Sequence, residues 1–257
     1  MTSASTFAAA AILLLAACGT EEAPGPLAPS GPTGRVRFVN MITDPARNPV
    51  NAILEGVPFG VNLGYTGTTP SSLPAPATAN YAAILTGPRT IVLRRTANPS
   101  VEVATLTFTI NQGEDQTVYA TGGTGGAAIG TLVTGDVNTA PPAGQTAIRV
   151  VNLSPTAGPI DVFLTAPGAD LATATPLATN IAYASASPYV NVPAGTYQFR
   201  AVPAGTLPAN RAANVRIDLT GATSGLAPLV AGTGRTIVTG DNASGGAPLR
   251  AFVLTDR

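Results

Sequence analysis

The stretch Thr105-Leu-Thr-Phe-Thr-Ile110 decides the fold class, because polar and apolar side chains alternate along it with a period of two. A β-strand places successive side chains on opposite faces, so this stretch has one polar and one apolar face. The same alternation occurs in Arg35-Val-Arg-Phe-Val39 and in Asn214-Val-Arg-Ile-Asp-Leu219. Clusters of Gly, Pro, Asn and Asp separate such stretches by roughly 8–12 residues, which is typical of a β-sandwich or barrel. We therefore predict an all-β protein.

Two parts of the chain repeat each other in the same order. Arg37-Phe-Val-Asn40 recurs as Arg149-Val-Val-Asn152, and Asn62-Leu-Gly-Tyr65 recurs as Asn180-Ile-Ala-Tyr183. Each copy holds about 100 residues, a normal size for one sandwich. We predict two tandem immunoglobulin-like antiparallel β-sandwich domains, with repeat 1 at 35–136, a linker at 137–146 and repeat 2 at 147–257.

The N-terminus carries an apolar run at residues 7–17 that ends at Cys18, the single cysteine of the chain. Eleven residues are too few for a transmembrane helix and suit the core of a signal peptide. The segment Leu15-Ala-Ala-Cys-Gly19 resembles a bacterial lipobox. That resemblance implies a signal peptide at 1–17, cleavage between Ala17 and Cys18, and lipidation of Cys18 with acyl chains such as palmitate.

Residues 18–34 follow as a tether, in which four prolines disfavour both helix and sheet. We expect an exported protein that is lipid-anchored in the cell envelope, at the outer membrane or cell surface rather than the inner membrane. A free hydrophobic N-terminus and an ordinary secretory peptide are the alternatives. No later apolar run reaches membrane-spanning length.

The composition excludes several classes of function. Of the 257 residues only 10% are charged, all thirteen cations are Arg, and His and Lys are absent. Without His there is neither a Ser-His-Asp triad nor an imidazole metal site. Without Lys there is neither a Schiff base nor a P-loop. Because the formal charge is 0, we also expect no nucleic-acid partner. We predict a chain without catalysis or cofactor.

Two features could be mistaken for catalytic sites. Gly122-Gly-Thr-Gly-Gly126 could cradle a phosphate, but it lacks the P-loop lysine and precedes a predicted strand, so we interpret it as a hairpin loop. Paired carboxylates could serve a glycosidase. However, Glu102, Asp161 and Asp218 alternate with apolar residues, which predicts solvent-exposed faces.

Two binding hypotheses remain weaker than their structural alternatives. Asp44, Asp161 and Asp241 lie near predicted strand ends, where sandwiches can hold calcium, but no ligand-dense loop accompanies them. Four tyrosines could stack on a carbohydrate. Because they recur between the copies, we interpret them as core or corner residues: Tyr65, Tyr81, Tyr183 and Tyr189.

The second copy resembles the bacterial family called domain of unknown function 4397. The resemblance rests on four segments: Ile148-Arg-Val-Val-Asn-Leu-Ser-Pro155, Ile160-Asp-Val-Phe163, Asn180-Ile-Ala-Tyr183 and Val192-Pro-Ala-Gly-Thr-Tyr-Gln-Phe199. It covers 147–257 well and 35–136 more loosely. It implies an exported, often lipid-anchored protein built from β-rich units, and it implies no activity.

The sequence thus predicts a membrane-anchored envelope lipoprotein with a structural, adhesive or ligand-binding role. We expect a monomer whose partners are the membrane, through its anchor, and an envelope or extracellular protein or glycan. One alternative is a carboxylate-dependent hydrolase of glycans, and another is a calcium-stiffened spacer without a ligand. Limited proteolysis within 137–146 should leave two resistant fragments if the domain division is right.

Overall fold

The computed structural model describes residues 31–70, 80–220 and 226–257. The predicted signal peptide, Ala17, Cys18 and most of the predicted tether therefore lie outside the described residues. Within the described part of the chain, no helix is both long and apolar enough to cross a membrane.

The first half of the described chain forms two sheets, an inner sheet and an outer sheet. Its inner sheet has the order β4-β1-β8-β9, with β5 also paired to β1. Its outer sheet has the order β3-β2-β6-β7. The strands are β1 (Thr33–Ile42), β2 (Val50–Leu54), β3 (Val57–Leu63), β4 (Thr68–Thr69), β5 (Ala82–Leu85), β6 (Gly87–Arg95), β7 (Asn98–Ile110), β8 (Asp115–Gly122) and β9 (Ile129–Asp136).

The second half repeats this topology strand for strand. Its inner sheet is β13-β10-β17-β18 with β14 paired to β10, and its outer sheet is β12-β11-β15-β16. In each half the first strand runs parallel to the eighth, and the other pairings are antiparallel. The strands are β10 (Gln145–Leu153), β11 (Ile160–Thr165), β12 (Ala178–Ile181), β13 (Ser185–Ala186), β14 (Val190–Pro193), β15 (Gln198–Pro203), β16 (Ile217–Thr220), β17 (Gly234–Gly240) and β18 (Arg250–Thr255).

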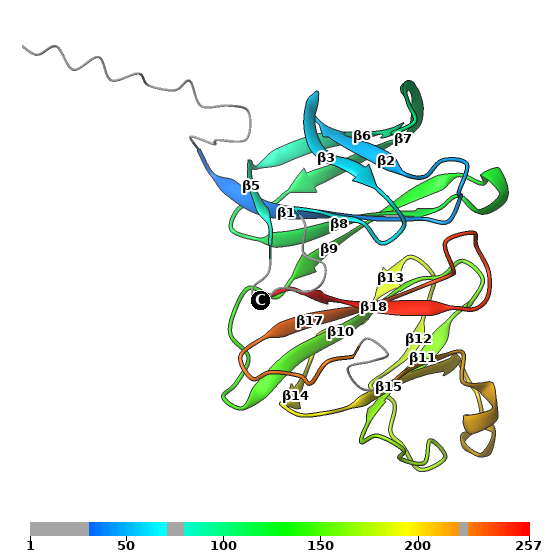
Figure 1. Ribbon diagram of the computed structural model, residues 1–257. Helices are drawn as coiled ribbons and strands as arrows, with labels where there is room; N and C mark the ends of the chain where they lie inside the picture. The colour runs from blue at the N-terminus through cyan, green and yellow to red at the C-terminus, as the bar shows by residue number, and fades with distance from the viewer. Residues whose placement is uncertain (1–30, 71–79, 221–225) are drawn as a thin grey trace, which may run out of the picture.

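The four sheets stack as outer, inner, inner and outer layers, from top to bottom in Figure 1. Each half has its own core between its two sheets, centred on residues such as Phe38 and Phe199. A third apolar cluster lies between the two inner sheets, formed by Val39, Met41, Tyr119, Val151, Leu153, Val238 and Leu254. The all-β class and the two sandwiches are thereby confirmed.

The inner sheets bury both faces, which the alternating pattern did not predict. All eight residues of β8 are buried, and so are eight of the nine residues of β10. Phe38 points into the first core, whereas its neighbour Val39 points toward the other half. The polar positions on these strands therefore face a second sheet instead of water.

Several predicted boundaries were wrong by a few residues. β1 begins at Thr33, inside the predicted tether, because Thr33 and Gly34 pair with β5. β10 begins at Gln145, so the connection between the halves spans 137–144. The predicted strand at 214–219 begins only at Ile217, since Asn214 ends the second of two short 3-10 turns, η2 (Pro208–Asn210) and η3 (Ala212–Asn214).

Candidate functional site

The junction between the inner sheets contains a buried arginine from the first half. Arg37 on β1 is fully buried, and its Nη2 donates to Oδ1 of Asp256 at 2.8 Å in the second half. Its Nη1 donates to the carbonyl of Thr255 at 2.6 Å. Its Nε and Nη2 donate to Oγ1 of Thr117 at 3.1 and 2.8 Å. Arg37 thus holds the C-terminal end of the second half against β1 and β8.

Arg149 on β10 makes the reciprocal set of contacts. Its Nη2 donates to Oδ1 of Asp136 in the first half, and its Nη1 donates to the carbonyl of Gly135 at 2.7 Å. Its Nε donates to Oγ1 of Thr236 at 2.8 Å. Each arginine therefore binds the aspartate of the other half and the backbone carbonyl just before that aspartate. This reciprocity is the property of a two-fold, self-complementary interface.

Each aspartate is also held by its own half. Asp136 accepts hydrogen bonds from Thr117 and, at 2.7 Å, from the hydroxyl of Tyr81. Asp256 accepts from Thr236 at 2.7 Å and from Tyr189 at 3.0 Å. The two tyrosine rings cover the arginines, with the guanidinium carbons 4.7 and 4.6 Å from the ring centroids. We call these eight residues the clasp: Arg37, Tyr81, Thr117, Asp136, Arg149, Tyr189, Thr236 and Asp256.

The charged groups of the clasp sum to zero and are buried. Two arginines face two aspartates, and none of the four side chains is more than 4% exposed. Burial alone would lower the pKa of Arg37, but Tyr81, Asp256 and Asp136 together raise it above its ordinary value. Burial, together with the nearby Asp136, raises the pKa of Asp256. Both arginines consequently stay charged, and they compensate the cost of burying the two carboxylates.

Burial also raises the pKa of four tyrosines at the junction, so their hydroxyls stay protonated in strongly basic solution: Tyr65, Tyr81, Tyr119 and Tyr189. Tyr119 differs from the others, because its buried hydroxyl has no hydrogen-bond partner among the described residues. Its counterpart in the repeat is Val238 on β17. The two-fold relation therefore breaks at the centre of the junction.

At the opposite end of the junction, each half extends a tyrosine over a glycine of the other. The hydroxyl of Tyr65 donates to the carbonyl of Asp241 at 2.5 Å, and a Cβ at Gly240 would lie 2.5 Å from that hydroxyl. Tyr183 reaches Oγ1 of Thr121 at 3.3 Å and lies near Gly122 in the same way. These are the tyrosines that the repeated motifs placed at equivalent positions.

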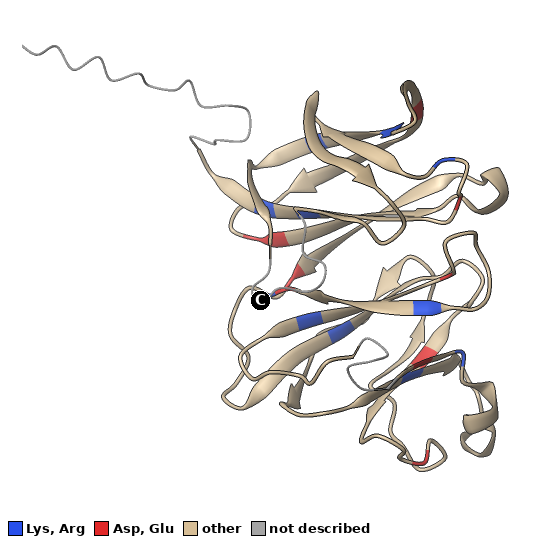
Figure 2. Ribbon diagram, in the orientation of Figure 1, with Lys and Arg blue, Asp and Glu red and all other residues tan. Residues whose placement is uncertain are grey.

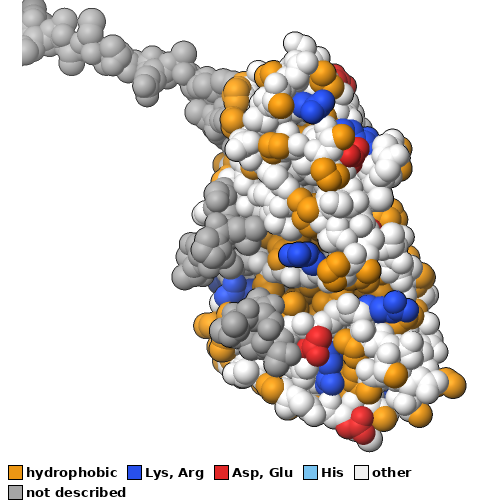
Figure 3. Space-filling view, turned by 45° about the vertical axis from the view of Figure 1, so that its right-hand side comes forward, with side chains coloured by type: hydrophobic (Ala, Val, Ile, Leu, Met, Phe, Trp, Pro, Cys, Tyr) orange, Lys and Arg blue, Asp and Glu red, His pale blue; other side chains and the backbone are white. Residues whose placement is uncertain are grey.

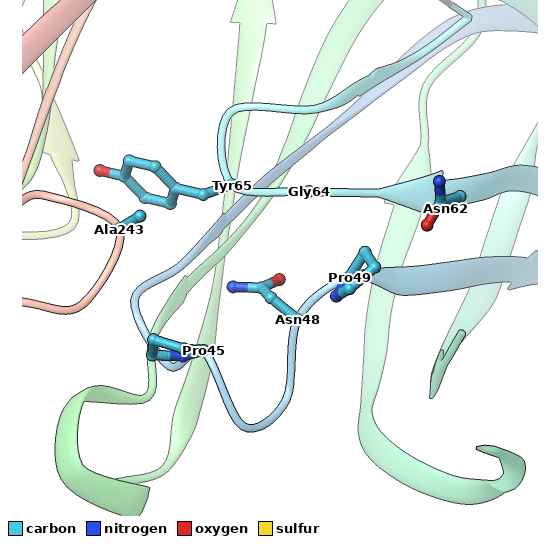
Figure 4. Close-up of a pocket in the computed structure, with 7 residues that line it drawn as sticks. All are labelled: Pro45, Asn48, Pro49, Asn62, Gly64, Tyr65 and Ala243. Atoms are coloured by element: carbon cyan, nitrogen blue, oxygen red, sulfur yellow. The ribbon is translucent and has the colours of Figure 1, made fainter. Parts of the chain in front are cut away.

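A surface pocket of about 420 Å³ opens beside Tyr65. It is lined by the β1–β2 connection, by the end of β3, and by the β17–β18 connection of the other half: Pro45, Asn48, Pro49, Asn62, Gly64, Tyr65 and Ala243. In Figure 4 the Tyr65 ring points toward Ala243 at one end, while Pro49 and Asn62 lie at the other. We call this the junction pocket, because both halves contribute to it.

The remaining predicted site residues are dispersed. The loop at Gly122–Gly126 joins β8 to its antiparallel neighbour β9 through the 3-10 turn η1 (Thr124–Gly126), which confirms the hairpin interpretation. The carboxylate of Asp44 pairs with Arg47, and the buried carboxylate of Asp241 accepts from Ser154 and Thr156.

Of the three acids predicted on solvent-exposed faces, one is buried. Asp161 is 7% exposed, because its carboxylate accepts from the backbone N–H groups of Asn180 and Gly205. Glu102 and Asp218 are exposed, as predicted. Within the described part of the chain, no three or more His, Cys, Asp or Glu side chains come together.

Sequence reasoning missed the clasp. From the sequence, Arg37 and Arg149 stood out only as parts of repeated motifs, and neither Asp136 nor Asp256 was expected to pair with them. The available signal was that both copies put an arginine at the same strand position in a chain with few charges. Figure 2 shows how few charged residues lie on the strands. Each copy also ends its last strand at or next to an aspartate.

Comparison with known proteins gives a match to one family. Residues 34–163 match the family described as a domain of unknown function (DUF4397), which spans the first half and the first two strands of the second. From the sequence alone, the closer resemblance was expected over 147–257 instead. No curated protein matches the chain.

Among solved structures, a leucine-rich repeat protein from Bacteroides thetaiotaomicron VPI-5482 shares 12% identity at a TM-score of 0.19. The alignment covers 82% of this chain and 26% of that one. A TM-score this low does not relate the two folds.

Proposed function

This chain belongs to the DUF4397 family, and from that premise we propose that it is an exported, lipid-anchored, non-catalytic binding protein made of two copies of that domain. The clasp is the observation that carries the proposal. It joins the two sandwiches into one body that presents their connecting loops together, and loops on a rigid scaffold are where binding usually resides.

Two features support a second copy of the domain in residues 145–257. The nine strands of each half pair in the same order, including the single parallel pairing. The clasp residues also occupy equivalent strands, with Arg37 and Arg149 on the first strand and Thr117 and Thr236 on the eighth. A duplication explains why each arginine finds the same partners in the opposite half.

The state of the carboxylates supports a role without catalysis. A glycan hydrolase needs two carboxylates that reach the substrate from opposite sides. Asp136 and Asp256 are close enough for Arg37 to contact both, but both are buried and bound to arginines. A substrate would have to separate the two halves to reach them. The calcium-spacer alternative would gain support if added calcium raised the melting temperature.

Anchoring rests on the lipobox-like segment around Cys18. Replacing Cys18 with Ala removes the thiol that would carry the lipid, so we expect the protein to leave the membrane pellet and to lose incorporation of labelled palmitate. Thr20→Ala, two residues away, is the matched control and should stay in the pellet. A Cys18→Ala protein that still pellets with membranes would refute the anchor.

Protease treatment of intact cells then decides which side of the envelope the sandwiches occupy. Loss of the 35–257 region from intact cells would place them at the surface and favour extracellular partners. Loss only after the envelope is permeabilised would place them in the periplasm and would end the adhesive interpretation.

A further inference from the structure

We propose that the junction pocket binds a neutral saccharide. This inference deepens the proposed binding role by naming a ligand class. It depends on the two halves being joined, because Ala243 of the second half closes one end of a pocket otherwise built by the first.

The walls of the pocket are fixed before any ligand arrives. Asn40 is fully buried, and its Nδ2 donates to Oδ1 of Asn48 at 2.8 Å in one wall and to the carbonyls of Leu63 and Gly64 at 2.9 and 3.1 Å in the other. The hydroxyl bond to Asp241 fixes the ring of Tyr65. A preformed pocket avoids most of the ordering cost of binding.

The chemistry of the lining selects an uncharged ligand with flat apolar faces. Pro45, Pro49 and the Tyr65 ring offer apolar surface, and none of the lining residues that the structure describes is charged. Asp44 and Arg47, which flank lining residues in the β1–β2 connection, pair with each other. On the face drawn in Figure 3, charged side chains are few beside apolar and neutral polar groups. A sugar ring combines C–H faces, which can pack on such groups, with hydroxyls at its rim.

Asn62 supplies the polar contact. Its side-chain amide has no hydrogen-bond partner among the described residues, and the residue is exposed. The amide offers two N–H donors and one acceptor, which suits neighbouring sugar hydroxyls. The amide of Asn48 is already used, since it donates to the carbonyl of Ile42 and accepts from Asn40.

A proline-rich peptide fits the pocket less well. Grooves for such peptides are lined by several aromatic residues. Here Tyr65 is the single aromatic side chain among the described residues of the lining, and its hydroxyl is committed to Asp241. The lining therefore favours the saccharide.

Asn62→Gly is the decisive variant, because it removes the amide without straining the backbone. Asn62 has φ +56°, a left-handed conformation that glycine adopts freely. Asn180 holds the equivalent position in the second half with φ +51° and does not line the junction pocket. Asn180→Gly is therefore the matched control, and Tyr65→Phe tests whether fixing the ring through its bond to Asp241 contributes to binding.

The assay is binding of the full chain to an array of neutral and acidic glycans, followed by NMR titration with the neutral glycan that binds best. We expect Asn62→Gly to weaken binding about 2–10-fold, as for one hydrogen bond, while Asn180→Gly changes it less than about 2-fold. Tyr65→Phe should also weaken binding, because the ring loses the bond to Asp241 that fixes it.

Three results would overturn the proposal: no binding to any neutral glycan, equal effects of Asn62→Gly and Asn180→Gly, or perturbation of the pocket resonances by decaproline and not by glycans. None of these results would affect the anchor or the clasp, because membrane pelleting and unfolding are measured separately.

Discussion

Replacing Arg37 with Met tests whether the clasp joins the two halves. The change removes a fully buried charge together with its bonds to Asp256, Thr255 and Thr117. It leaves the carboxylate of Asp256 buried without its arginine. Breaking a buried pair in this way costs about 3–5 kcal/mol. That is a large part of the about 5–15 kcal/mol by which proteins are stable.

We expect the melting temperature to fall by about 6–20 °C, since each kcal/mol lost lowers it by about 2–4 °C in a protein of this size. Calorimetry and circular dichroism should show one cooperative transition in the unaltered chain, because the apolar cluster and the clasp link both sandwiches. In the variant the transition should broaden or split as the halves unfold separately.

Three further variants make this test specific. Arg149→Met should cost about as much as Arg37→Met, because its contacts are equivalent. Adding Asp256→Asn to Arg37→Met should restore part of the loss, since the uncompensated charge is removed. Arg216→Met, at an exposed arginine, should change stability by less than about 0.5 kcal/mol. A loss below about 1 kcal/mol for Arg37→Met would refute the reasoning.

Four other outcomes are expected. Gly240→Ala should destabilise the chain by about 1–3 kcal/mol in urea unfolding, because the added Cβ would lie 2.5 Å from the Tyr65 hydroxyl. Gly130→Ala is the control and should leave stability unchanged, because the atom nearest to its added Cβ is 3.9 Å away. Tyr119→Phe should leave stability unchanged or raise it, since it removes a buried hydroxyl that has no partner among the described residues; a loss above about 1 kcal/mol would contradict this. The free energy of unfolding should fall as the pH rises above about 10. In that range tyrosines ionise in the unfolded chain, whereas the four junction tyrosines, whose pKa is raised, stay protonated in the folded chain. Tyrosinate absorbance during unfolding measures this difference. A broad-specificity protease should cut within 137–144, and the two fragments should then co-elute in gel filtration because the clasp does not depend on that connection.

Much of the fold could be predicted from sequence, because strand alternation is a local property. Thr105–Ile110 lies within β7, and the repeated motifs at Arg37 and Arg149 mark the first strands of two equivalent sandwiches. The repeat also placed Tyr65 and Tyr183 at equivalent positions, where we expected core or corner residues. Boundaries were less accurate, since the start of β1 depends on its pairing with β5, which is distant in sequence.

The candidate site could not be predicted, because its partners are remote in sequence. Arg37 and Asp256 are separated by 219 positions, and the junction pocket joins residues near 45–65 to Ala243. Local patterns carry no information about which distant loops meet. The pocket also depends on the β17–β18 connection, whose position follows from the docking of one sandwich on the other.

The sequence by itself indicated the strand class, the internal repeat and the predicted export signal, since each depends on side chains that are neighbours along the chain. The tertiary structure alone decided whether the polar faces of the inner strands contact water or another sheet. Alternation shows that Arg37, Thr117 and Arg149 share the face opposite the core, but not whether that face meets water. Only the stacking of the second inner sheet converts it into a buried, neutral clasp, because each arginine finds its aspartate in the other half.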